Sequence, residues 1–83
     1  MKLTKYVKFR EEKFGGVLFE TRSEKVFTLN PTAAAVVREI LAGGDETAVL
    51  ARLTEQYRDD GGATGREAAA YIAELRQKGL VED

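Results

Sequence analysis

Two pairs of adjacent carboxylates, Glu11-Glu12 and Asp59-Asp60, are the residues of this sequence with the most obvious potential for acid–base chemistry. An acid–base pair must converge on one substrate, with a nucleophile or second base beside it. Adjacent residues on a strand point to opposite faces, so the two glutamates diverge if their segment is extended. The two aspartates precede two glycines, which is typical of a solvated loop. We therefore expect no enzymatic activity.

The 83-residue chain contains no histidine and no cysteine. The commonest metal ligand and neutral-pH proton carrier is absent, so we expect no metal site, and no disulfide can form. No segment approaches the roughly 20 apolar residues of a membrane helix, and the start of the chain lacks an apolar signal core. The composition thus predicts one domain, residues 1–83, that is cytoplasmic and has no contact with a membrane.

Charge is divided unevenly along the chain. Residues 1–30 carry seven Lys or Arg and four Glu, whereas residues 31–83 carry six basic and ten acidic side chains. The first part is therefore +3 and the second −4, which gives the overall charge of −1. A nucleic-acid-binding domain usually has a dense basic face and an alkaline pI, so we expect no nucleic acid partner. The asymmetry is typical of a mixed solvated surface, with steering of an acidic ligand as the alternative.

Three short segments in the first 30 residues have the character of strands. Val7 and Phe9 alternate with polar neighbours, the period-two pattern of a half-buried strand. The glycines after Phe14 permit a tight turn, and short connections imply antiparallel pairing. We expect strands over residues 5–11, 16–21 and 25–29.

The junction after the third strand is the most informative local feature. Asn30 can cap a helix with its side-chain oxygen, and Pro31 stands at the first helical position, where its missing N–H costs nothing. Thr64 and Glu67 form a capping-box pattern ahead of a later helix. Apolar spacing predicts helices over residues 31–42, 46–58 and 65–78. The fold class is therefore α+β, a three-stranded antiparallel sheet followed by three helices (β-β-β-α-α-α), which is winged-helix-like.

The run from Phe27 to Ala34, Phe-Thr-Leu-Asn-Pro-Thr-Ala-Ala, resembles the strand-to-helix signature of PqqD-like peptide chaperones, which include the RiPP recognition elements. The similarity covers about residues 8–82. It continues through Gly44, Thr47, Leu53 and Tyr57 to Leu75 and the ending Lys78-Gly79-Leu80-Val81. The Phe14-Gly15-Gly16 opening is more similar to mycofactocin-type and other stand-alone members. The pyrroloquinoline quinone chaperones instead have a Pro-Glu-Gly-like turn where this chain has residues 20–24.

The resemblance implies a stand-alone leader-peptide chaperone without a cofactor of its own. In this family the leader of a ribosomally synthesised precursor peptide docks between the third strand and the third helix and extends the sheet by one strand. The precursor is then presented to a modifying enzyme, which in related systems is a radical S-adenosylmethionine (SAM) enzyme. On this chain the peptide-binding edge would be Lys25, Val26, Phe27, Thr28 and Leu29.

The third helix is expected to supply the opposing wall of the binding site. Projection at about 100° per residue directs Ala68, Ile72 and Leu75 toward the core. One flank then carries Arg66, Ala69, Ala73 and Arg76, and the other carries Glu67, Tyr71, Glu74 and Lys78. We expect the first flank, together with Ile72, to line the groove, because its alanines permit close approach and its arginines can pair with leader carboxylates. The second flank is the alternative.

A small winged-helix DNA-binding regulator is the alternative function for the same order of elements, with the third helix reading DNA. Phosphate contacts require several cations, but that helix carries only Arg66, Arg76 and Lys78 against two glutamates. The unpaired sheet edge leaves the oligomeric state open between a monomer and a strand-exchanged dimer.

Overall fold

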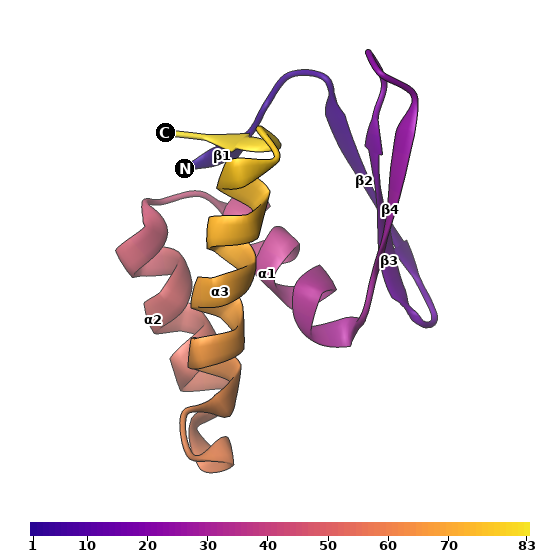
Figure 1. Ribbon diagram of the computed structural model, residues 1–83. Helices are drawn as coiled ribbons and strands as arrows, with labels where there is room; N and C mark the ends of the chain where they lie inside the picture. The colour runs from indigo at the N-terminus through magenta and orange to yellow at the C-terminus, as the bar shows by residue number, and fades with distance from the viewer.

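A three-stranded antiparallel sheet stands beside three helices in the computed structural model, which describes residues 1–83 (Figure 1). The strands are β2 (Val7–Glu12), β3 (Gly15–Glu20) and β4 (Lys25–Leu29), arranged in the order β2-β3-β4. The helices are α1 (Pro31–Ala42), α2 (Glu46–Gln56) and α3 (Ala63–Gln77), with one turn of 3₁₀ helix over Arg58–Asp60. This order confirms the expected α+β class.

A second, two-stranded sheet was not predicted. Its strands β1 (Lys2–Leu3) and β5 (Val81–Glu82) pair antiparallel, with Leu3 opposite Val81. Segments of two residues give no alternation pattern, and their pairing joins the two ends of the chain, so no local signal predicts them. The pairing holds the end of α3 beside the N-terminal segment (Figure 1).

The register of the large sheet decides which side chains face the core. The cross-strand partners Phe9, Leu18 and Phe27 share one face, and Leu18 is completely buried. On the opposite face Val26 is 59% exposed. Since β4 pairs only with β3, its other edge has no strand partner.

The three helices supply the rest of the core. All three present fully buried apolar side chains to a single cluster, which also includes Leu18 and Leu29 of the sheet. The helical members with at most 1% exposure are Ala34, Val36, Val37 and Ile40 of α1, Val49 and Leu53 of α2, and Ala68 and Ile72 of α3. The burial of α3 fixes its position against α1 and α2.

The passage from β4 into α1 is fixed by two local features. The side chain of Asn30 accepts a hydrogen bond from the Ala33 N–H at 2.8 Å and so caps α1. Gly15 approaches the same backbone so closely that an added Cβ would lie 2.2 Å from the Leu29 carbonyl oxygen. Its φ of +142° is also a conformation that other residues rarely adopt. The turn between β2 and β3 can therefore pack against this junction only because it carries glycine.

The capping box expected at the start of α3 is wrong. The helix begins at Ala63, and the carboxylate of Asp60 accepts hydrogen bonds from the N–H groups of Gly62 and Thr64, each at 3.0 Å. The Thr64 hydroxyl also donates to Asp60, an interaction that lowers the pKa of this carboxyl. Asp60 therefore caps the first turn of α3 in place of Thr64.

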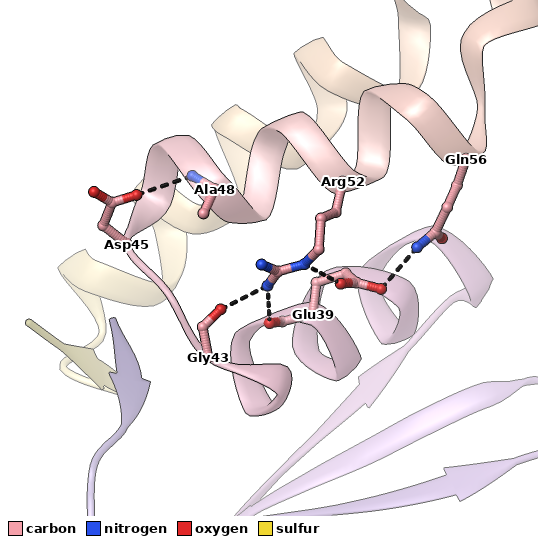
Figure 2. Close-up of polar contacts among 6 residues, drawn as sticks. All are labelled: Glu39, Gly43, Asp45, Ala48, Arg52 and Gln56. Atoms are coloured by element: carbon pink, nitrogen blue, oxygen red, sulfur yellow. Dashed lines mark hydrogen bonds and ion pairs between the residues drawn. The ribbon is translucent and has the colours of Figure 1, made fainter.

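Arg52 of α2 ties the end of α1 to α2 (Figure 2). Its Nε donates to the Glu39 carboxylate at 2.6 Å, and one Nη donates to the carbonyl oxygens of Glu39 and Gly43 at 2.8 and 2.6 Å. Gln56 donates to the second Glu39 oxygen at 2.8 Å, and Asp45 caps α2 through the Ala48 N–H. Carbonyls at a helix end lack intrahelical partners, so the guanidinium satisfies the end of α1.

We predict that Arg52→Met lowers the free energy of unfolding by about 2 kcal/mol, because carbonyl and carboxylate oxygens lose a charged donor. The matched variant Arg58→Met removes an ion pair with Glu55 in which both side chains are more than two-thirds exposed. It should cost less than about 0.5 kcal/mol. Urea unfolding of both variants measures the difference, and equal losses would contradict the role given to Arg52.

We also predict that stability decreases with acid through Glu39. Hydrogen bonds from Arg52 and then Gln56 lower the pKa of this carboxyl below its ordinary 4.5. Its stabilising contribution is therefore complete above about pH 4.5 and is lost as the pH falls through the lowered folded-state value. Glu39→Gln should be less stable than wild type at pH 7 and should lose less stability between about pH 5 and pH 3. Urea unfolding across that range tests this, and parallel pH profiles would contradict it.

Candidate functional site

A groove with a volume of about 280 Å³ lies between β4 and α3. Its walls are mainly apolar, and its charged members, Glu74 and Lys78, come from the helix. From the sheet it is lined by Val26, Phe27, Thr28 and Leu29, and from the helix and the segment after it by Tyr71, Glu74, Leu75, Lys78 and Leu80. The strand with the unpaired edge is thus one wall of the groove.

The hollow continues toward the start of α1. A second depression of about 430 Å³ shares Tyr71 and Glu74 with the first, so the two form one surface along α3. Its other lining residues are Asn30, Thr32, Ala33, Glu67 and Ala70. We call the two depressions together the β4–α3 groove.

Tyr71 lies where the two depressions meet. Its side chain is partly buried against the core, and this burial, with a smaller contribution from the Glu74 charge, raises its pKa to about 12. The phenol is therefore neutral at any physiological pH and keeps a hydroxyl that can donate or accept a hydrogen bond.

Lys78 stands at the other end of the groove. Its Nζ lies 3.8 Å from a carboxylate oxygen of Glu74 and 5.4 Å from the centre of the Phe27 ring. The distance of the ion pair is long, but the Lys78 ammonium also stands over the Phe27 ring, which lines this part of the groove. Lys78 thereby connects α3 to the side chain of a β4 residue.

The flank of α3 that we expected to line the groove lies elsewhere. Arg76 is paired with Glu46 of α2 and, at 3.0 Å, with Asp83, which raises its pKa further. Arg66 donates to the carbonyl oxygen of Gly61 at 3.3 Å. None of Arg66, Ala69, Ala73 and Arg76 borders the β4–α3 groove, and this corrects our expectation.

The physical reason is that helical projection finds the buried direction of a helix but not the neighbour on each side of it. Arg76 faces α2, so the opposite flank, with Tyr71, faces β4. Ile72 is fully buried and supports the wall from within without reaching the groove surface. Projection did group the groove-lining residues Glu67, Tyr71, Glu74 and Lys78 as one flank, but Ala70 and Leu80 were not anticipated.

Four of the five residues of β4 border the groove. Val26, Phe27, Thr28 and Leu29 all border the groove, whereas Lys25 is exposed at the start of β4 and does not line it. Leu29 is only 2% exposed, so mainly its backbone is available to a partner. Phe27 is partly buried and packs against the core.

The adjacent carboxylates Glu11 and Glu12 have separate partners. Glu11 pairs with Arg38 at 3.1 Å and Glu12 with Arg10, so the two glutamates do not converge. Asp60 is occupied in capping α3. The structure contains no group of three or more residues arranged to hold a metal ion. None of its helices has the length and apolar character that crossing a membrane requires.

The family model described as "Coenzyme PQQ synthesis protein D (PqqD)" matches residues 15–81, which includes the whole of β4, the three helices and the start of β5. The chain belongs to the PqqD family. Its fold, with the sheet β2-β3-β4 followed by three helices, is that of the PqqD-like RiPP recognition elements. A search of curated protein sequences found no match.

Solved structures with this fold include two described with leader peptides. The chain is 28% identical to "Lasso peptide synthetase B1 complexed with the leader peptide", with a TM-score of 0.76 over 99% of this chain and 96% of that one. It is 18% identical to "TbiB1 in Complex with the TbiA(beta) Leader Peptide", with a TM-score of 0.81 over 99% and 95%. The second likeness concerns the fold alone.

A third similar structure is SuiB from Streptococcus suis, which is 20% identical with a TM-score of 0.56. The match covers 93% of this PqqD-family chain but only 21% of SuiB. The same fold thus also occurs as a minor part of a longer polypeptide.

Proposed function

We propose that this PqqD-family protein binds the leader of a ribosomally synthesised precursor peptide by adding it as a strand to the edge of β4. The observation that carries the proposal is the unpaired edge of β4 beside a mainly apolar groove with α3 as its second wall. Main-chain hydrogen bonds provide affinity in strand addition, and pockets for alternate side chains provide specificity. The unpaired edge of β4, which would otherwise favour aggregation, then serves as the binding site for the peptide.

The comparisons support this proposal at the level of the ligand. Two of the similar structures are described as complexes with a leader peptide, and one of them is 28% identical over nearly the whole chain. We therefore assign a ligand of the same class, a leader peptide, to the β4–α3 groove. A DNA-binding role has less support, because the face of α3 toward the groove has two glutamates and one lysine.

We assign the roles within the groove as follows. The backbone of Lys25–Leu29 forms the hydrogen-bond ladder with the peptide, and the side chains of Ala70, Tyr71, Glu74 and Lys78 contact it from the helix. Ile72 and Leu75 support that wall from the core, where they are 0% and 2% exposed. Arg66, Ala69, Ala73 and Arg76 are left out of the binding surface.

The protein acts in this proposal without catalysis and without a cofactor. It holds the leader in the cytoplasm, where ribosomes make the precursor, and leaves the segment to be modified free for a separate enzyme. Family resemblance favours a radical SAM enzyme as that partner. A lasso peptide synthetase is the second candidate, favoured by the 28% identical structure. Co-purification of each class of enzyme with the tagged protein distinguishes the two.

Strand addition predicts a period of two in the sensitivity of the peptide backbone. Alternate residues of an added strand direct their N–H groups toward β4, and the intervening ones point away. The test peptide is a synthetic copy of a leader that is encoded next to the gene of this protein. N-methylation of its residues one at a time should weaken binding by about tenfold at every second position. Fluorescence anisotropy measures the affinities, and a uniform effect along the peptide would exclude strand addition.

NMR chemical-shift changes of the isotope-labelled protein locate the surface at which the leader peptide binds. We expect them in residues 25–29 and on the Tyr71 flank of α3 with the leader, but not with a short DNA duplex. Changes caused by the duplex, centred on α3 and abolished by salt, would support the winged-helix alternative. A strand-exchanged dimer would use the same edge, so dissociation of a dimer on peptide addition also counts for the proposal.

A matched pair of alanines tests which flank of α3 meets the peptide. Ala70 and Ala73 are both exposed on the same helix, but only Ala70 borders the groove. Ala70→Trp should fill the groove and weaken leader binding by about tenfold or more, whereas Ala73→Trp should leave it within about twofold. Circular dichroism checks that both variants remain folded. The reverse ranking would restore the Arg66–Arg76 flank as the binding surface.

A further inference from the structure

Electrostatic charge is distributed unequally along the β4–α3 groove. The depression beside the start of α1 is lined by Glu67 and Glu74 and by no lysine or arginine. The other depression, beside Val26 and Phe27, is lined by Lys78 together with Glu74, so its charges balance. The groove is therefore acidic near Asn30 and close to neutral beside β4.

The two carboxylates of the acidic end are poorly neutralised within the molecule. Glu67 has no Lys or Arg nitrogen within 4.0 Å, and Glu74 has only the Lys78 contact at 3.8 Å. Glu11, an exposed carboxylate of β2, has a closer cation, Arg38 at 3.1 Å. Burial is the main cause of the raised pKa of Tyr71, and the negative charge of Glu74 adds to it.

The same depression has room for a long side chain. Its volume is about 430 Å³, and methyl groups of Ala33 and Ala70 form part of its lining. The aliphatic stem of a lysine or arginine can lie along such groups while its charged end reaches a carboxylate. An acidic side chain at this place would meet two like charges.

We propose that the groove selects leader peptides that carry a lysine or arginine at the position facing Glu67 and Glu74. This inference rests on the proposed function and gives the charge of the residue that the protein recognises. It is opposite in sign to the acidic leader residues that the arginines of the other flank would have selected.

Contact between this basic residue and the two glutamates also sets the register of the bound peptide. Main-chain pairing alone is tolerant of slippage along an edge. Along a helix that rises about 1.5 Å per residue, Glu67 lies about 16 Å from Lys78. An extended peptide spans that distance with about five residues at about 3.3 Å each. The basic residue therefore has one place in the groove, at the Asn30 end.

Selection from a random library tests the inference without knowledge of the natural leader. Random peptides of about twelve residues are displayed and selected on the wild type, on the double variant Glu67→Lys/Glu74→Lys, and on the control Glu55→Lys. Glu55 is an exposed helical carboxylate outside the groove, paired only with Arg58. Wild type and control should enrich one Lys or Arg at a fixed position among apolar residues, and the double variant should enrich Asp or Glu there.

The affinities of individual selected peptides then measure how much the basic residue contributes to binding. Replacing the enriched Lys by Gln in a selected peptide should weaken its binding to wild type by about three- to tenfold at low salt, and by less in 0.5 M NaCl. Replacing the same Lys by Glu should restore binding to the double variant. Circular dichroism confirms that each variant is folded.

The outcomes separate this inference from the function on which it rests. Peptides that bind β4 with no preferred charge, or with a preference unchanged in the double variant, overturn the charge selection and leave leader binding intact. A library that yields no peptide binding at residues 25–29 overturns both.

Discussion

The close contact between Gly15 and the backbone of Leu29 and Asn30 is the constraint on which the binding groove depends. It holds the turn between β2 and β3 against the point where β4 becomes α1. The direction in which the sheet leaves the helices is set at this point, since Asn30 and Pro31 begin α1 without a loop. A wider junction would move β4 relative to α3 and change the width of the groove between them.

The second wall depends on long-range packing. Ile72 and Leu75 anchor α3 in the core, while Arg76 holds its far side to α2 and Asp60 fixes its first turn. The β1–β5 pairing retains its last turn beside the N-terminal segment. With the helix fixed at both ends and on one side, the remaining flank is the one free to meet a ligand. The edge of β4 therefore faces a rigid surface, which reduces the ordering cost of binding.

The parts of this arrangement that sequence could predict are those encoded locally. The α+β order follows from alternation in the strands and from the Asn30-Pro31 helix start, and residues 25–29 could be identified as an edge from the short connections. The groove-lining flank could not be chosen, because it depends on where α2 packs. Thr64 was assigned the cap that Asp60 provides, since both are capping residues and only the loop conformation at Gly62 decides between them.

In the proposed function, the open edge of β4 provides affinity for an extended peptide but does not discriminate between peptide sequences. Backbone ladders accept many sequences, so a chaperone that relied on β4 alone would also bind unrelated extended chains and other copies of itself. Discrimination must then come from the side chains that line the groove, and all the charged ones belong to α3 or directly follow it. Glu67 lies at one end of the groove, and Lys78, which pairs with Glu74, lies at the other. If the groove binds leader peptides as proposed, a peptide in the wrong register or of the wrong charge would meet a like charge there, and selection would come largely from repulsion.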